Sequence, residues 1–316
     1  MFSYILRRLL SSLVVLFIVV TITFFMIQIA PGGLSILMRP DITAEEAARL
    51  ARNLGLDRPP HVQYLNWLRN VLTGDFGQSL AYGGRSVLEM VIERLPATMY
   101  LGLSAMLLTL ILGIPTGIIA ARNQNNAIDQ VLSFFSFLGL ATPNFWLGIM
   151  FIVLFSVELN WLPASGIRST GAESSLWDRI RHLLMPAVVL GTSSVATIVR
   201  YTRSSWLETM RLDYVLVAQS KGLSRRKIDY KHILRNAIIP VVTVFGIALP
   251  RIVGGAAVVE TLFSWPGLGQ LAVDAALRRD TPLILGVTIF ISAAVIFSNL
   301  LVDMLYPILD PRIRYE

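Results

Sequence analysis

The sequence predicts an all-α integral membrane protein with six transmembrane helices and both termini in the cytoplasm. Hydrophobic residues make up 54% of the 316 residues and charged residues 15%, whereas soluble domains average about 45–50% and about 25%. Six apolar runs are long enough for a helix to cross a hydrocarbon core of about 30 Å. The excess of positive charge lies on one side of these runs, which sets the orientation.

The six apolar runs extend over most of the chain. They are 9–30, 96–121, 131–157, 183–199, 237–263 and 282–306. The first run follows Arg7 and Arg8, as a signal peptide would. Because it exceeds the roughly 7–15 apolar residues of a cleavable signal, we expect it to remain as a transmembrane helix.

The distribution of Lys and Arg predicts which loops are cytoplasmic. The loop 201–236, hereafter the basic loop, carries eight basic and three acidic residues. The intervening segments 31–95, 158–182 and 264–281 each balance basic and acidic residues. Since positive loops stay in the cytoplasm, the basic loop and both termini are predicted to be cytoplasmic. This one-sided pattern also explains the basic balance without nucleic acid as a partner.

The segment 31–95 is predicted to be a small helical extracytoplasmic insertion. Thr43 and Glu46 form a capping box ahead of apolar residues at helical spacing, and Gly55 is suited to end that helix. A second helix is expected over 62–72, with Trp67 and Leu68 available to the membrane or to a partner. A packed insertion without a partner is an equally good interpretation.

The basic loop is predicted to form two short helices around a turn at Gly222-Leu223-Ser224. Gly222 can adopt positive φ, and Ser224 is a suitable N-cap for the basic helix that follows. A short helix tied to two membrane helices suits the transmission of force. Lying passively on the lipid surface is the alternative.

The same loop contains a motif that resembles one in a known family. Residues 218–224 have the sequence Ala-Gln-Ser-Lys-Gly-Leu-Ser, and 232–240 have His-Ile-Leu-Arg-Asn-Ala-Ile-Ile-Pro. Together they resemble the coupling-loop motif of permease subunits of binding-protein-dependent ABC importers. The stretches 54–59, 74–79 and 263–269 are similar to the dipeptide, oligopeptide and nickel branch, first permease subunit.

The motif differs from the general family pattern at two places. The general motif begins with Glu-Ala-Ala, whereas this chain has Leu216-Val217-Ala218, so an acidic contact of the general family is absent. Pro240 follows Gly222 by 18 residues, and that longer spacing is typical of the peptide and nickel branch.

The resemblance implies a type I ABC importer transmembrane fold and a set of partners in the bacterial or archaeal cytoplasmic membrane. These partners are a second homologous permease subunit in a heterodimer, two ABC ATPase subunits at the basic loop, and an extracytoplasmic solute-binding protein. ATP and Mg²⁺ would be used by the ATPases, and no cofactor is expected on this chain. The sequence has no Gly-Lys dipeptide and hence no P-loop, so ATP hydrolysis must come from another polypeptide.

The resemblance also implies which residues of the basic loop couple to the ATPases. Gly222 would allow a close approach, Leu223 would offer an apolar contact, and Lys221, Arg225 and Arg226 would face acidic side chains. Arg235 and Asn236 are expected to cap a helix end, and Pro240 to begin the next membrane helix. The full set of expected coupling residues is Ala218, Lys221, Gly222, Leu223, Ser224, Arg225, Arg226, Arg235, Asn236 and Pro240.

Polar residues within the apolar runs are candidates for the translocation path or its gate, because they are costly in lipid unless paired or hydrated. These candidates are Asn144, Arg251 and Glu260. Arg251 either faces the pore or pairs with the partner permease or with Asp303. Asn144 either faces the path or satisfies backbone groups freed by Pro143.

Glycines and prolines within the same runs are expected to break the helices and to provide hinges. They are Gly113, Pro115, Gly117, Gly139, Pro143, Gly246, Pro250, Gly254 and Gly255.

The whole chain therefore divides into an N-terminal transmembrane helix (1–30), the insertion (31–95), a permease core of five transmembrane helices (96–306) and a cytoplasmic tail (307–316). An ion channel, an autonomous carrier and an intramembrane enzyme are the competing functions. No loop resembles a selectivity filter, and no cysteine or closely spaced histidine pair provides a metal site. The solute stays open among dipeptides, oligopeptides, glutathione, nickel chelates and sugars.

Overall fold

The computed structural model describes residues 2–29, 43, 45, 58–169 and 175–309. Within these ranges the regular secondary structure is helical, apart from one isolated bridge between Gln78 and Ser86. The predicted capping box at Thr43 and Glu46 and its helix lie outside the described residues. The chain forms two compact units: Phe2–Thr98 with Pro266–Ile296, and Met99–Trp265 with Phe297–Glu316.

The unit that contains the N-terminus is built from apolar helices around two buried clusters. Its helices are α1 (Phe2–Ile29), α3 (Pro60–Leu72), α11 (Leu268–Leu277), and the first parts of α4 (Val87–Arg122) and α12 (Thr281–Leu309). The larger cluster brings α4, α11 and α12 together and comprises Val87, Met90, Val91, Leu268, Leu271, Ala275, Leu283 and Val287.

Helix α3 confirms the helix predicted over 62–72 and packs against α1. The Tyr64 ring lies 5.2 Å from that of Phe24, and the Tyr64 and Thr21 hydroxyls are 2.7 Å apart. Trp67 and Leu68 pack against the smaller buried cluster of this unit, which consists of Phe24, Tyr64 and Leu285. This segment of the insertion is therefore anchored on the first transmembrane helix.

A buried carboxylate fixes the loop between α3 and α4 in the same unit. Asp280 is fully buried and accepts hydrogen bonds from the Ser79 hydroxyl and from the Ala81 N–H, the latter at 2.9 Å. The loop is thereby joined to the start of α12, which explains how a segment without regular structure holds its position.

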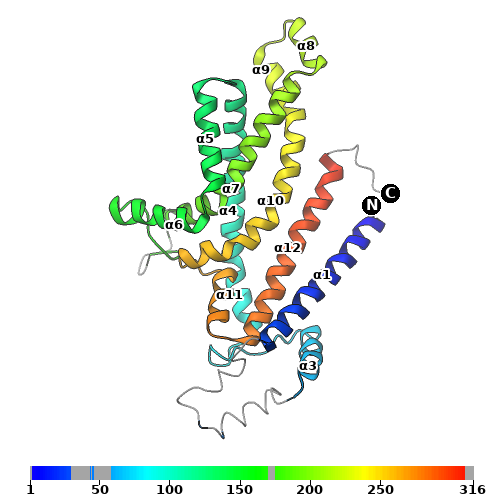
Figure 1. The fold of residues 1–316 in the computed structure, drawn as a ribbon, viewed down its shortest axis with the longest axis vertical. Helices are drawn as coiled ribbons and strands as arrows, with labels where there is room; N and C mark the ends of the chain where they lie inside the picture. Colours follow the sequence, from blue (N-terminus) through cyan, green and yellow to red (C-terminus); the bar gives the residue numbers. More distant parts are fainter. Residues whose placement is uncertain (1, 30–42, 44, 46–57, 170–174, 310–316) are drawn as a thin grey trace. The chain divides into compact units, whose positions relative to one another are not determined.

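The other unit contains the helices that carry the basic loop. Helices α4, α5 (Ala127–Ala141), α7 (Leu176–Met210) and α10 (Leu234–Leu262) run alongside one another (Figure 1). A Cβ atom at Gly117 would lie 2.6 Å from Thr202 Cβ and 2.7 Å from the Val199 carbonyl oxygen, both on α7. Helix α4 is thus in close backbone contact with α7.

The expected helix breaks at most glycines and prolines are wrong. Helix α4 continues through Gly113, Pro115 and Gly117, α5 through Gly139, and α10 through Pro240, Pro250 and the 254–255 glycine pair. Helix α10 nevertheless changes direction along its length (Figure 1). The glycines of α4 serve close packing instead, since small residues let membrane helices approach each other. Prolines are tolerated in such helices because the freed backbone groups find other partners.

One predicted break is present, and it changes the third transmembrane run. The run 131–157 forms α5 and then α6 (Asn144–Phe151), which continues as the π-helix η2 (Ile152–Glu158), with a bend of 108° between the pair. Thr142 before Pro143 has an extended backbone, φ −83° and ψ 122°, because a residue before proline disfavours the α region. The run 131–157 is therefore two helices, and the break expected at Pro143 is confirmed.

The other five runs are confirmed as continuous helices, and several are longer than the apolar run predicted. Five helices of the described chain are long and apolar enough to cross a membrane, and the bent pair brings the total to six. The helices exceed the runs because they also include polar and charged residues beyond the apolar stretches. This chain is a multi-pass membrane protein.

Candidate functional site

The basic loop folds as a compact structure at the end of α7 and α10 (Figure 1). It consists of α8 (Asp213–Ser220), a turn, α9 (Arg225–Lys227) and the π-helix η3 (Ile228–Ile233), which leads directly into α10. The predicted pair of short helices around a turn is confirmed. A π-helix holds one extra residue per turn and is frequent at functional positions.

Gly222 forms the turn between α8 and α9. Its φ is +72°, a conformation that favours glycine, and its N–H donates to the Gln219 carbonyl at 2.9 Å. Ser224 occupies the N-cap position of α9 with an extended backbone, but its side chain makes no capping hydrogen bond. The predicted N-cap position of Ser224 is confirmed. A capping hydrogen bond from its side chain is not: the N–H groups of Lys227 and Ile228 donate to the backbone carbonyl of Ser224.

The underside of the basic loop packs on an apolar cluster. Trp206 and Ala218 are buried, and Leu223 is half-buried against them. The buried members are Ala121, Trp206, Leu207, Val215, Ala218, Ile228, Ile233 and Ala237. The loop is therefore a folded part of the unit that contains α7 and α10. Only the exposed part of the Leu223 side chain is available to a partner.

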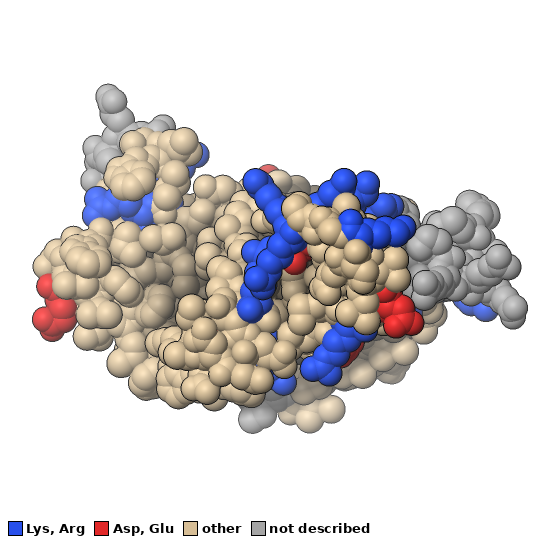
Figure 2. All heavy atoms as spheres, turned by 90° about the horizontal axis from the view of Figure 1, so that it is seen from above, with Lys and Arg blue, Asp and Glu red and all other residues tan. Residues whose placement is uncertain are grey.

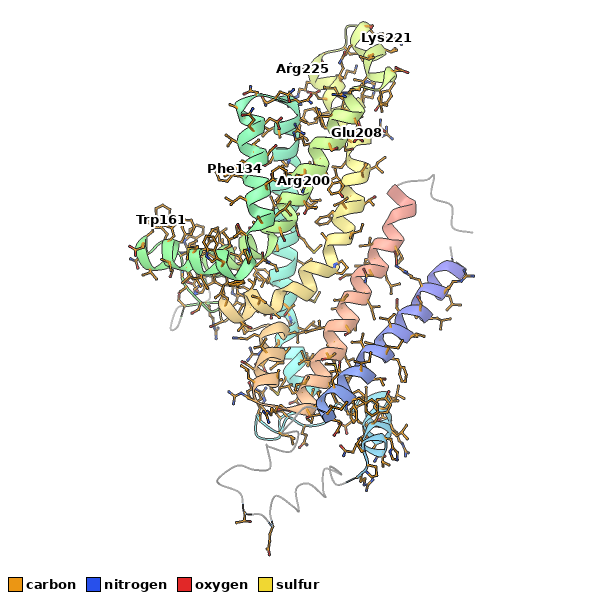
Figure 3. The ribbon with its side chains drawn as sticks, viewed as in Figure 1. Phe134, Trp161, Arg200, Glu208, Lys221 and Arg225 are labelled. Carbon is orange, nitrogen blue, oxygen red and sulfur yellow. The ribbon has the colours of Figure 1, made fainter. Side chains whose placement is uncertain are left out.

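The outer surface of the loop is cationic. Lys and Arg side chains gather over α8 and α9 in Figure 2, and Lys221 and Arg225 lie at this end in Figure 3. Lys221, Arg225 and Arg226 are exposed, and none forms an ion pair with another described residue. A hollow of about 440 Å³ is lined by Arg122, Arg225, Arg226, Asp229 and Tyr230. The surface suits an acidic partner.

Two expected roles in the second half of the motif are wrong. Asn236 lies inside α10, where its side-chain amide donates to the Tyr214 hydroxyl at 2.7 Å and to the His232 carbonyl at 3.2 Å. It joins α8 to α10 instead of capping a helix end, and Arg235 beside it is exposed within the same helix. Pro240 lies in the second turn of α10 and does not begin it, because η3 continues into α10 without a break.

The intramembrane candidates do not form one site. Glu260 is fully buried, so it lines no open cavity in this conformation. Asn144 is half-buried and is the first residue of α6. At the break before it, the Leu138 carbonyl accepts a hydrogen bond from the Thr142 hydroxyl at 2.7 Å. The side chain of Arg251 lies outside the described part of the chain, although α10 is unbroken between 251 and 260.

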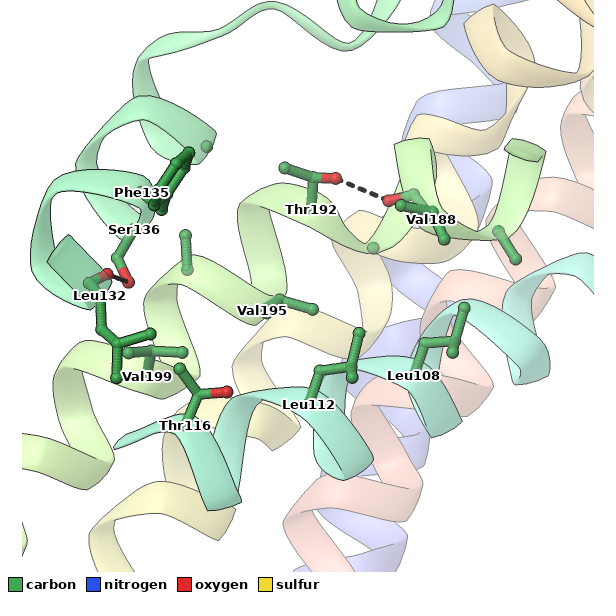
Figure 4. A pocket seen from close by; sticks show the side chains of 14 residues that line it. Leu108, Leu112, Thr116, Leu132, Phe135, Ser136, Val188, Thr192, Val195 and Val199 are labelled. Carbon is green, nitrogen blue, oxygen red and sulfur yellow. Dashed lines mark hydrogen bonds between the residues drawn. The ribbon is translucent and has the colours of Figure 1, made fainter. Parts of the chain in front are cut away.

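An apolar cavity lies between α4, α5 and α7 (Figure 4). Its volume is about 220 Å³, and its wall includes Leu108, Leu112, Phe135 and Val195. The Ser136 and Thr192 hydroxyls in the wall donate to carbonyls of their own helices, at 2.8 and 2.7 Å. The wall is almost entirely apolar, so it offers little to orient a charged solute.

Sequence reasoning missed two ion pairs that support the basic loop. Arg122 pairs with Asp229 at 2.6 Å, and Arg203 pairs with Asp129 at 2.6 Å. The partners lie far apart in the sequence, and no local pattern indicates such pairs. Among the described residues no group of three or more His, Cys, Asp or Glu side chains is placed to hold a metal ion.

Comparison with known proteins assigns the family. Residues 113–315 match the family described as "Binding-protein-dependent transport system inner membrane component", and residues 1–102 match its N-terminal counterpart. The chain is 42% identical to the oligopeptide transport system permease protein AppB of Bacillus subtilis over 316 residues, covering all of both chains. It is 38% identical to the dipeptide transport system permease protein DppB of Escherichia coli K12, again over the full length of both.

A solved structure supports the fold independently. The chain resembles the MetNI methionine ABC transporter in an inward-facing conformation, with a TM-score of 0.55 and 16% identity. The match covers 71% of this chain and 97% of that one. The predicted type I importer fold is therefore confirmed for the permease core.

Proposed function

Because the chain belongs to the family of binding-protein-dependent transport system inner membrane components and is a permease subunit of such an importer, we propose that its solutes are peptides. The observation that carries this proposal is that relatives matching over their full lengths are named as oligopeptide and dipeptide permeases. A permease subunit is not the catalytic part of the complex. The channel, carrier and enzyme alternatives find no support in this family.

The proposed partners follow the architecture of such importers, in which permeases pair and ATPases drive transport. We propose a heterodimer with a second permease, two ATPase subunits that use ATP and Mg²⁺, an extracytoplasmic solute-binding protein, and a place in the bacterial cytoplasmic membrane. The two permeases would enclose the pore. Asn144, Arg251 and Glu260 remain predictions for the path, as do the domain limits 1–30, 31–95, 96–306 and 307–316.

The basic loop is proposed to receive the motion of an ATPase. Its exposed cations Lys221, Arg225 and Arg226 suit acidic side chains, and its underside is fixed by the apolar cluster. Closure of the ATPase dimer on ATP would draw the two loops of a permease pair together and open the pore outward. Hydrolysis would return it to the inward-facing state.

Reversal of two of these charges tests the docking surface. Arg225→Glu with Arg226→Glu is expected to weaken ATPase binding about tenfold, because each exposed charge contributes up to about 1 kcal/mol and its reversal adds repulsion. The measurement is the amount of ATPase subunit that co-purifies with the chain at graded salt. Arg168→Glu, at an exposed arginine outside the basic loop, is the matched control. Equal recovery with both variants would contradict the assignment of the basic loop.

Uptake in proteoliposomes tests the substrate class. The complex is purified with its co-purifying polypeptides, reconstituted, and supplied with ATP and labelled peptides of two to five residues, with a nickel chelate as comparison. ATP-dependent accumulation of peptides that needs the solute-binding protein is the expected result. Accumulation of the chelate alone would overturn the peptide proposal and leave the family assignment intact.

A further inference from the structure

The hairpin of α4 and α5 carries one charged residue on each side of its short turn. Arg122 is the last residue of α4, Asp129 lies in the first turn of α5, and only residues 123–126 separate the two helices. Each of these charges forms an ion pair with a different helical segment of the basic loop, Asp229 on η3 and Arg203 on the last turns of α7.

Arg122 joins three elements through one guanidinium group. Its Nη2 donates to Asp229 Oδ2 at 2.6 Å, and Asp229 lies on η3 with 7% of its surface exposed. The guanidinium carbon also lies 5.5 Å from the centre of the Trp206 ring on α7 and 5.9 Å from that of Tyr230 on η3. A planar guanidinium is suited to pair and stack at the same time.

Asp129 holds the other side of the turn. Arg203 on α7 donates to both carboxylate oxygens, from Nε at 2.6 Å and from Nη2 at 2.7 Å. The same carboxylate accepts the Asn125 N–H at 3.0 Å, and Asp129 is 4% exposed. A two-point contact of this kind fixes orientation as well as distance.

The two pairs lie on either side of α8 and α9 within the basic loop. Arg203 precedes α8, and Asp229 follows α9, so the chain on both sides of these two helices is tied to the same hairpin. The downstream tie is on η3, a π-helix, and helices commonly kink at π-bulges. Trp206, beneath Arg122, belongs to the apolar cluster on which the loop rests.

We propose that the α4–α5 hairpin and the basic loop move as one rigid body, with Arg122 and Asp129 as the positioning residues. Force applied to the loop then enters the membrane through α4 and α5 instead of being absorbed by bending of η3. This inference rests on the proposed function, because it assumes that an ATPase displaces the loop.

Distances between two spin labels test the rigid body directly. The chain has no cysteine, so labels at Gln124→Cys in the hairpin turn and Gln219→Cys at the end of α8 are specific once the partners' thiols are blocked; both positions are exposed and lie outside the proposed docking cations. In the assembled complex we expect the same distance distribution without nucleotide and with a non-hydrolysable ATP analogue. Arg122→Gln should broaden it. A shift of the mean distance between the two states of the otherwise unmodified chain would overturn the inference.

Transport stoichiometry provides the second test. In proteoliposomes, Arg122→Gln and Asp229→Asn are expected to lower the number of peptides imported per ATP hydrolysed severalfold, and Asp229→Glu to restore most of it. Neutralising the exposed Arg85–Glu93 pair, whose side chains are 53% and 59% exposed, is the matched control and should leave the ratio unchanged.

The outcomes separate this inference from the proposed function. A complex that fails to bind ATPases or to import peptides contradicts the proposed function. A complex that assembles and imports peptides at the original ratio despite Arg122→Gln contradicts only the rigid-body inference. A purely structural role would reduce the amount of complex recovered and leave the ratio of uptake to hydrolysis unaltered.

Discussion

At the scale of single residues, the backbone of Gly222 is the feature most open to a direct test. Its φ is +72°, and a Cβ atom there would meet nothing within 4 Å. A substitution therefore acts through the backbone conformation and not through a clash within this chain. The left-handed region costs other residues about 1–2 kcal/mol, least for asparagine and most for β-branched residues.

We expect Gly222→Val to rearrange the turn and to abolish the stimulation of ATPase activity by substrate, while Gly222→Asn keeps most of it. The measurement is ATP hydrolysis by the reconstituted complex with and without substrate, alongside the amount of chain inserted in the membrane. Equal loss in both variants would instead indicate that an ATPase occupies the open space around Gly222. The backbone explanation would then be wrong.

Sequence reasoning predicted the residues of the site that depend on local chemistry and missed those that depend on tertiary contact. Gly222 and the position of Ser224 follow from turn and cap preferences within a few residues. The pair of Arg122 and Asp229 spans 107 residues, and no single-sequence pattern marks it. A helix that begins at Pro240 would leave Asn236 ahead of its first turn, but α10 begins at Leu234. The side-chain partner of Asn236 is Tyr214, 22 residues away.

At the scale of elements, the contact between α4 and α7 depends on glycine. A Cβ atom at Gly117 would come within 2.7 Å of the Val199 carbonyl oxygen, a backbone atom that cannot move aside cheaply. Gly117→Ala is expected to lower the free energy of unfolding by about 1–3 kcal/mol, as overpacking does. The measurement is the unfolding midpoint of the purified chain in a denaturing detergent titration.

Gly254→Ala is the matched control for that change. Gly254 also lies inside a membrane helix, but a Cβ atom there would meet nothing within 4 Å. Its substitution should leave the unfolding midpoint unchanged or raise it, since alanine favours helix. If Gly117→Ala behaves like this control, then α4 and α7 separate readily and the close contact does not stabilise the unit.

The helices themselves were largely predictable, because a run of about 20 apolar residues has few alternatives in a bilayer. The position of the bend between α5 and α6 was predictable, but its angle was not. Pro143 indicated a break, but the angle of 108° between α5 and α6 depends on how each helix packs. Pro115 gave the same local signal, and α4 continues through it, so a proline alone does not decide whether a helix ends.

At the scale of the whole molecule, charge distribution predicts how the chain lies across the membrane. The basic loop carries eight of the 27 Lys and Arg residues, against three acidic ones, and all three lysines of the chain lie within it. The segments 31–95 and 158–182 each contain equal numbers of basic and acidic residues. Basic loops are retained in the cytoplasm, so the basic loop and both termini are expected there.

The absence of native cysteine makes this orientation measurable with single substitutions. Lys221→Cys places a thiol in the basic loop, and Arg168→Cys places one in the segment 158–182; both positions are exposed. A membrane-impermeant maleimide applied to spheroplasts should label Arg168→Cys directly. It should label Lys221→Cys only after the membrane has been permeabilised. The opposite order would place the basic loop outside, where no ATP is available, and would remove the basis for coupling through Gly222. Labelling of both thiols in intact cells would mean that the chain inserts in two orientations, which the one-sided charge pattern forbids.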